Sequence, residues 1–111
     1  VDEAIEVFLT MTKEFPGSPE PYNNLGVIYA GRGMYDQARE SLVAALRANP
    51  DDPVAQENLG DVYVRLAIKA YEQVPTINPS NRTITKKLTL LRELSANGER
   101  AKSNGAPSNP P

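Results

Sequence analysis

The chain has 111 residues, of which 40% are hydrophobic, and this length suits one small domain. It contains neither cysteine nor histidine, which removes disulfide bonds, thiolate or imidazole nucleophiles and the commonest zinc ligands. The formal net charge of −2 argues against a nucleic-acid partner, because non-specific nucleic-acid affinity depends on clustered Lys and Arg. We therefore expect no enzyme, no catalytic or metal-binding residue and no cofactor.

Three helices are predicted in the first half of the chain. The first covers residues 2–15, where apolar side chains recur at three- and four-residue steps, and Pro16-Gly17 ends it. The second covers residues 19–32 and begins with a proline, which the first helical position tolerates. The third covers residues 35–48, so the second and third helices form an antiparallel hairpin.

Two further helices are predicted in the second half. No glycine or proline occurs in 64–73, so we expect one long helix over 54–73, or else a very tight kink. A last helix over 80–96 ends at Asn97-Gly98 and has one apolar stripe, formed by Ile84, Leu88, Leu91 and Leu94. Residues 98–111 lack apolar periodicity and are rich in Pro, Gly, Ser and Asn, which predicts a disordered tail or linker.

A short phrase occurs twice in the chain and sets a repeat period. The sequence Asn-Leu-Gly, with a tyrosine shortly after it, ends at Gly26 and again at Gly60, 34 residues later. The same step places residues of like type on one another: Ala4 on Ala38, Phe8 on Leu42, Met11 on Ala45, Pro16 on Pro50 and Pro19 on Pro53. A fixed period of about 20–50 residues is typical of a solenoid of stacked supersecondary units.

The last copy of this unit is shortened. Its second half follows the preceding copy at an offset of 29 residues instead of 34, which pairs Ala67, Tyr71, Val74 and Pro79 with Ala38, Leu42, Ala45 and Pro50. The five missing residues correspond to the turn at 31–35. A helix that does not turn back leaves its apolar residues in need of another partner.

Residues 19–52 resemble one tetratricopeptide repeat. The resemblance rests on an aromatic residue, Leu-Gly, Tyr, Ala, a large apolar residue, Ala and Pro, which are here Tyr22, Leu25, Gly26, Tyr29, Ala38, Leu42, Ala45 and Pro50. It implies an all-α fold, a right-handed α-solenoid of antiparallel helix pairs that a C-terminal capping helix closes. The repeat domain is then 1–97, divided into a partial repeat at 1–18, a full repeat at 19–52, a shortened repeat at 53–79 and the capping helix at 80–97.

Each glycine of the repeated phrase is expected to allow two helices to approach closely. We predict that Gly26 lies against Ala38 and that Gly60 lies against Ala67, because a residue without a side chain leaves room there. Tyr29 and Leu42 would fill the wider gap nearby. Small residues beside large ones would thus set the angle of each hairpin.

The helix face opposite the core is the predicted binding surface. In tetratricopeptide repeats the first helices line a concave groove that takes extended or helical peptides, so the resemblance implies a protein or peptide partner. Asparagine carboxamides can bind a peptide backbone, and Glu57 with Asp61 favours Lys or Arg on the ligand. The candidate groove residues are Glu20, Asn23, Asn24, Val27, Glu57, Asn58, Asp61 and Arg65. The alternative is that these residues form only a solvated surface.

Two other roles stay open. The first is a structural module that forms a homodimer through Ala67, Tyr71 and Val74, unless the last helix covers these residues within the chain. The second is a spacer before a downstream domain. Val1 falls inside a repeat and is not a Met, so we interpret the chain as part of a larger, bacterial protein. No apolar run approaches the roughly 20 residues of a membrane-spanning helix. We expect a soluble domain of the bacterial cytoplasm or periplasm, without membrane insertion.

Overall fold

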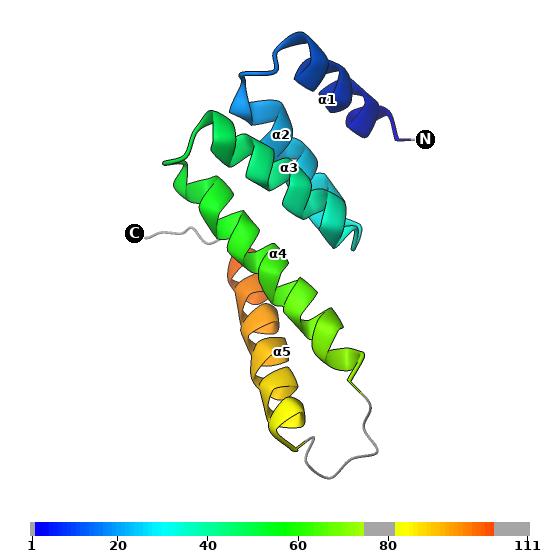
Figure 1. The fold of residues 1–111 in the computed structure, drawn as a ribbon, viewed down its shortest axis with the longest axis vertical. Coiled ribbons are helices and arrows are strands. Elements are labelled where there is room, and N and C mark those ends of the chain that lie inside the picture. The colour runs from blue at the N-terminus through cyan, green and yellow to red at the C-terminus, as the bar shows by residue number, and fades with distance from the viewer. Residues whose placement is uncertain (1, 75–81, 104–111) are drawn as a thin grey trace. The chain divides into compact units, whose positions relative to one another are not determined.

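The computed structural model describes residues 2–74 and 82–103, and all regular secondary structure in these ranges is helical. Five helices follow one another along the described chain (Figure 1). The chain divides into two compact units, residues 1–63 and 64–111, and the boundary falls inside helix α4. The all-α class that the sequence predicts is confirmed.

Helix α1 (Glu3–Glu14) begins at an aspartate cap. One carboxylate oxygen of Asp2 accepts hydrogen bonds from the backbone N–H groups of Ala4 at 2.9 Å and Ile5 at 3.2 Å. The other carboxylate oxygen forms an ion pair with Arg32, the residue that caps the end of α2. Asp2 thus satisfies two N–H groups that have no partner within the helix, and it connects the start of α1 to the end of α2.

Helices α2 (Pro19–Gly31) and α3 (Tyr35–Ala48) form the antiparallel hairpin of the first unit (Figure 1). The proline that opens α2 already has the backbone angle of a helix and gives up only an N–H group that the first turn leaves unpaired. Most of the described core belongs to this hairpin, where four apolar residues are at most 2% exposed: Leu25, Ala38, Leu42 and Ala45.

Close packing between the two helices depends on Gly26. A Cβ atom at this position would lie 2.5 Å from Cγ and 2.7 Å from Cδ2 of Leu42, well inside van der Waals contact. Leu42 is itself fully buried, so its side chain could move only by displacing other core atoms. The predicted close approach at Gly26 is confirmed, although the nearest side chain is Leu42 and not Ala38.

The turn between α2 and α3 is a Schellman motif built on Gly33. The Met34 N–H donates to the Tyr29 carbonyl at 2.9 Å, and the Gly33 N–H donates to the Ala30 carbonyl at 3.1 Å. Gly33 has a φ of 76°, in the left-handed region that costs a residue with a side chain roughly 1–2 kcal/mol. This glycine therefore allows the chain to reverse.

Helix α1 carries the residues that correspond, one repeat earlier, to the buried stripe of α3. It packs on α2, yet none of its residues is fully buried. Ala4 is exposed, and Phe8 and Met11 are half-buried. No described residue covers this stripe of α1 as α2 covers the stripe of α3.

Helix α4 (Pro53–Glu72) is continuous over 20 residues. Its start is capped by Asp52, whose Oδ1 accepts hydrogen bonds from the N–H groups of Val54 at 3.0 Å and Ala55 at 3.4 Å. The prediction of one long helix is confirmed: without the turn residues of the full repeat, the i to i−4 hydrogen bonds continue.

This continuity corrects the predicted packing of the shortened repeat. A Cβ atom at Gly60 would meet nothing within 4 Å, and Tyr63 is 49% exposed. The prediction that Gly60 packs against Ala67 is wrong, because Ala67 lies further along the same helix and not on a returning one. Gln56 stands where the full repeat has its aromatic residue, and its side-chain amide donates to the Pro50 carbonyl at 2.9 Å.

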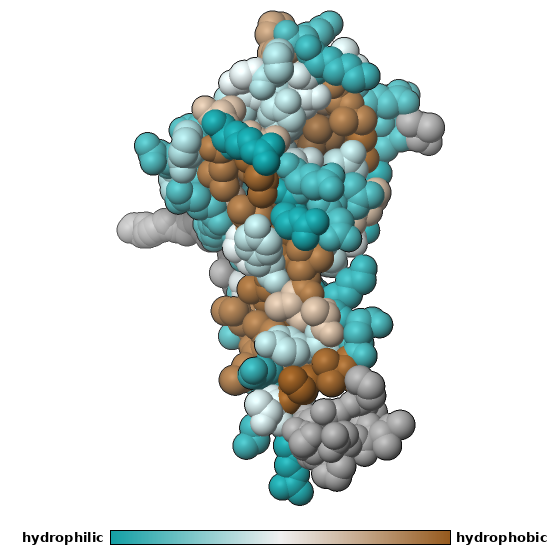
Figure 2. Space-filling view, viewed as in Figure 1, coloured by the Kyte–Doolittle hydropathy of each residue, from teal (hydrophilic) through white to brown (hydrophobic). Residues whose placement is uncertain are grey.

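Helix α5 (Arg82–Ser103) covers the residues for which the sequence predicts a capping helix, but its apolar stripe differs from the predicted one in one residue. Ile84, Leu88 and Leu91 are half-buried as predicted. Leu94, by contrast, is 55% exposed, and Leu90 is 65% exposed. Figure 2 shows apolar side chains on the surface over α4 and α5. Leu94 therefore belongs to an exposed side of the helix.

The predicted end of this helix is also wrong. Helix α5 passes through Asn97-Gly98 without a break and ends at Ser103. One glycine inside a helix costs roughly 1 kcal/mol relative to alanine, and the helix-forming residues at 99–102 compensate for that cost. The predicted tail at 98–111 therefore begins too early. Residues 104–111 and 75–79 lie outside the described residues.

Candidate functional site

The predicted binding face of α2 lies opposite the side that the helix buries. Pro21, Leu25 and Gly26 are the buried residues of α2. Glu20 and Asn24 are exposed, and Val27 keeps 52% of its surface exposed although it is apolar. The three- and four-residue spacing places these side chains on one side of the helix, where a partner has access to them.

Asn23 differs from its neighbours on this face. The residue is half-buried, and its Oδ1 atom is inaccessible to solvent and has no hydrogen-bond partner within the described part of the chain. A carboxamide oxygen accepts up to two hydrogen bonds, and leaving it unsatisfied in a buried position costs about 1–3 kcal/mol. Buried polar atoms without partners are uncommon and call for a physical explanation.

The first part of α4 shows the same division into two sides. Ala55 and Val62 are buried. Glu57 and Asp61, one helical turn apart, are exposed, while Asn58 is half-buried. The carboxylate of Asp61 is not isolated, because this residue already interacts with another group. The structure thus leaves two carboxylates at the surface where the sequence predicts contact with a ligand.

One predicted residue lies beyond the boundary between the two units, which falls inside the continuous helix α4. All the candidate groove residues except Arg65 belong to the first unit. Arg65 belongs to the second unit, is half-buried and already interacts with another group. The candidate site of the first unit therefore consists of exposed and half-buried residues of α2 and of the first part of α4.

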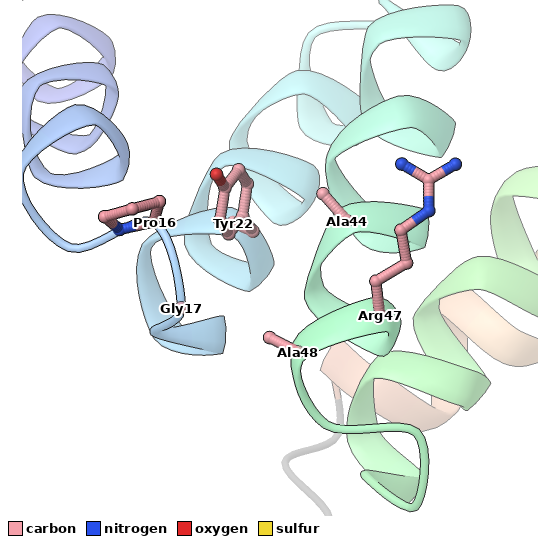
Figure 3. Close-up of a pocket in the computed structure, with 6 residues that line it drawn as sticks. All are labelled: Pro16, Gly17, Tyr22, Ala44, Arg47 and Ala48. Atoms are coloured by element: carbon pink, nitrogen blue, oxygen red, sulfur yellow. The ribbon is translucent and has the colours of Figure 1, made fainter.

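A pocket of about 330 Å³ lies elsewhere in the first unit, at the turn between α1 and α2. Figure 3 shows the Tyr22 ring between that turn and the last part of α3. The pocket is open to solvent, and its lining consists of Pro16, Gly17, Tyr22, Ala44, Arg47 and Ala48. Its volume falls at the lower end of the roughly 300–1,000 Å³ typical of ligand sites.

Sequence reasoning missed this pocket because it treats Tyr22 only as a core residue. The ring is in fact half-buried, so part of it faces the pocket. A signal was present in the sequence: Ala44 and Ala48 are four residues apart and thus share one face of α3, where their small side chains leave space. Arg47 also lines the pocket, but its guanidinium points away from Pro16 and Tyr22 (Figure 3).

The self-association candidates lie in the second unit and are partly covered within the chain. Ala67, Tyr71 and Val74 are each half-buried. Helix α5 packs beside this end of α4, as two contacts show: the Lys87 ammonium lies 5.7 Å from the centre of the Tyr71 ring, and Arg92 donates to Glu72 at 2.6 Å. Helix α5 therefore covers at least part of this stretch of α4.

Within residues 2–74 and 82–103, no group of three or more Asp or Glu side chains is placed to hold a metal ion. None of the described helices combines the length and the apolar character that crossing a membrane requires. Neither finding adds a candidate site to those above.

The fold is that of an all-helical repeat protein. Helix α2 and the first part of α4 each have one buried apolar side and one exposed, largely polar side. A family model described as tetratricopeptide repeat matches residues 1–61, more than half of the chain. The chain belongs to the tetratricopeptide repeat family, whose members in general are protein–protein interaction modules.

A curated relative extends the similarity but describes no activity. The chain is 34% identical over 71 residues to a protein from Pyropia yezoensis that bears the name uncharacterized protein ycf37. The match covers 60% of this chain, which spans 40% of the length of that relative. No solved structure matches the chain.

Proposed function

We propose that this domain is a scaffold that binds a partner protein through an extended or helical peptide, held against the exposed faces of α2 and the first part of α4. Membership of the tetratricopeptide repeat family supports an interaction role in general. The particular surface rests on the residues of this chain. The domain acts by binding and not by catalysis.

The observation that carries the proposal is the carboxamide of Asn23. Its Oδ1 is buried without a hydrogen-bond partner among the described residues, and it is flanked by exposed Glu20 and Asn24. A partner can reach this oxygen only when the Asn23 side chain rotates outward, and a backbone N–H group donated to it there would remove the cost of leaving it unsatisfied. Val27 adds exposed apolar area beside these polar groups, a combination typical of recognition surfaces.

The charge of the surface selects the ligand. Glu20 and Glu57 are exposed carboxylates, and residues 19–31 and 53–63 contain no lysine or arginine, the next cation along α4 being Arg65, one turn after Asp61. A cationic side chain therefore gains a charge-assisted hydrogen bond there, whereas an acidic one is repelled. We expect the bound segment to contain Lys or Arg.

Selection of a random peptide library on the whole chain tests this proposal. Selected peptides should be basic. Their affinity should fall about tenfold for Asn24→Ala and further for Glu57→Lys, because the charge reversal replaces an attraction by a repulsion. Isothermal titration calorimetry with the selected peptide measures these changes.

Glu40→Lys on α3 is the matched control, since it makes the same charge change at another exposed position of the first unit. It should change the affinity much less than Glu57→Lys. Equal losses for the two variants would mean that only net charge matters. Selected peptides that are acidic would contradict the proposed surface.

A second candidate function is self-association through the second unit. It is favoured by the exposed Leu90 and Leu94 on α5 and by the incomplete burial of Ala67, Tyr71 and Val74. Association of two copies would bury these leucines, each worth about 1.5–3 kcal/mol when it passes fully from water to an apolar environment. The domain would then hold two copies of a larger protein together.

Light scattering over a dilution series measures this association. A dimer that dissociates with Leu90→Glu and Leu94→Glu, but keeps its helical circular dichroism, would support self-association. Tyr71→Glu tests in the same way whether the predicted self-association residues Ala67, Tyr71 and Val74 form the dimer contact. A monomer at every concentration would remove this candidate and leave the peptide-binding proposal untouched.

A further inference from the structure

We propose that copies of this chain associate head to tail, with the apolar stripe of α1 in one copy packed against the surface around Gly60 on α4 of the next copy. This contact repeats between two chains the packing that α3 and α2 form within one chain. It goes beyond the peptide binding proposed above, and it does not involve the exposed leucines of α5.

Helix α1 provides one half of the contact. Its stripe of Ala4, Phe8 and Met11 stands one repeat before the fully buried stripe of α3. In α1 the first of these residues is exposed, the other two are half-buried, and no described residue covers them as α2 covers α3. Val7 and Phe15, which are 56% and 58% exposed, add apolar area at three- and four-residue steps along the same side. This stripe therefore lacks the helix that its equivalent in α3 has.

The first part of α4 provides the other half. Gly60 and Tyr63 correspond to Gly26 and Tyr29 of α2, the helix on which α3 packs. A Cβ atom at Gly60 would meet nothing within 4 Å, and Tyr63 is 49% exposed. Gly60 thus leaves open the kind of space that Leu42 fills at Gly26. This surface has the residues of α2 but lacks the helix that packs on α2.

The two halves match because the chain already contains one formed example of the contact. Phe8 is the residue of α1 that corresponds to Leu42, so the equivalent packing places its ring against Gly60. Phenylalanine is larger than leucine, and the open space at this glycine accommodates the larger side chain. The stripe of α1 and the pair Gly60 and Tyr63 contain no charged residue, so the contact buries no charge from them.

The two halves lie apart within one chain. Both belong to the first unit, where α1 packs on α2 and the α2–α3 hairpin lies between α1 and the first part of α4 (Figure 1). A contact between two different surfaces of one molecule leaves one surface of each kind free at the ends, so association continues past two copies or closes into a ring. One helix on one helix is a small contact, so we expect association only at high protein concentration.

Light scattering over a dilution series, with two variants that each block one half, tests this proposal. Ala4→Glu and Gly60→Glu change exposed helix positions, so circular dichroism should show that both variants stay helical. The native chain should form species larger than a dimer as its concentration rises. Each variant alone should associate at least about tenfold more weakly, because the contact would bury an unpaired carboxylate. An equimolar mixture of the two should form a dimer and nothing larger, since it restores one intact contact between them.

Leu9→Glu and Gly31→Glu are the matched controls. Leu9 is 41% exposed and stands five residues after Ala4, on another side of α1, and Gly31 ends α2 with nothing within 4 Å of its Cβ position. Both controls should associate like the native chain. A native chain that stays monomeric, or a mixture of the two blocked variants that associates no better than either alone, would overturn the proposal. So would a dimer that neither variant weakens, which is the result expected for self-association through α5.

Discussion

The full repeat and the shortened repeat contain the same Asn-Leu-Gly phrase but place it in opposite environments. A side chain at Gly26 would collide with Leu42 at 2.5 Å, whereas one at Gly60 would meet nothing within 4 Å. The tyrosine that follows also differs: Tyr29 is half-buried and Tyr63 is 49% exposed. The phrase alone therefore does not determine packing.

The difference originates in the turn. In the full repeat Gly33 reverses the chain, and α3 returns along α2 with a fully buried stripe of Ala38, Leu42 and Ala45. Without that turn, α4 continues, and the corresponding residues are only half-buried: Ala67, Tyr71 and Val74. A repeat motif thus specifies a packing partner only when the chain between its halves allows the partner to return.

The largest effect that this comparison predicts is on the buried stripe. Leu42→Ala should lower the free energy of unfolding by about 2–5 kcal/mol, because it opens a cavity in a fully packed core. Tyr71→Ala, at the corresponding position of the shortened repeat, should cost only about 1 kcal/mol, since the ring is half-buried. Urea unfolding followed by circular dichroism at far-ultraviolet wavelengths measures both. Similar losses would contradict the comparison.

A smaller loss is expected for Gly26→Ala. The added methyl group overpacks the core at Leu42, at a cost of about 1–3 kcal/mol, and alanine returns about 1 kcal/mol through its higher helix propensity. We expect a net loss of up to about 2 kcal/mol in the same unfolding experiment. Combining Gly26→Ala with Leu42→Ala is the control, because the cavity then accommodates the methyl group. The loss of unfolding free energy in the double variant should therefore be smaller than the sum of the losses in the two single variants.

The turn itself should respond more weakly. Gly33→Ala places a side chain at a φ of 76°, and the left-handed region costs such a residue about 1 kcal/mol or slightly more. Gly31→Ala is a matched control, since Gly31 ends α2 without a positive φ and has nothing within 4 Å of its Cβ position. A loss for Gly31→Ala as large as that for Gly33→Ala would mean that the left-handed backbone is not the cause.

Most of the fold was predictable from local signals. The proline and glycine positions bracket the first three helices to within a residue or two, and the missing turn predicts the continuity of α4. The glycine of the Asn97-Gly98 pair failed as a stop signal, because one glycine costs a helix less than the helix-forming residues around it provide. Local propensity is decisive only where no neighbouring effect of similar size opposes it.

The candidate site was predictable only in part. The side of α2 that faces solvent follows from helical periodicity, so the exposure of Glu20 and Asn24 was expected. The unpaired oxygen of Asn23 and the pocket around Tyr22 depend on which atoms of other helices come close, and periodicity contains no such distances. The contact of Tyr71 with Lys87 and the exposure of Leu94 likewise depend on how α5 is rotated about its own axis.

The smallest effect, and the only one of opposite sign, is expected at Gly60. Gly60→Ala should raise the free energy of unfolding by about 0.5–1 kcal/mol, because alanine favours the helix and the new methyl group meets no atom within 4 Å. The same substitution at Gly26 is destabilising. Urea unfolding of the two variants side by side measures this difference in sign. A loss at Gly60 would mean that another group packs against it.

Restoring the turn should reverse the sign at Gly60. Inserting Gly-Arg-Gly-Met-Tyr, the sequence of residues 31–35, between Val64 and Arg65 returns the offset of the shortened repeat to 34. The chain then folds back after Val64, and Tyr71 takes the place against Gly60 that Leu42 has against Gly26. In that background Gly60→Ala should destabilise the protein, since the methyl group now meets a buried ring. If Gly60→Ala remained stabilising after the insertion, the missing turn would not be what separates the two repeats.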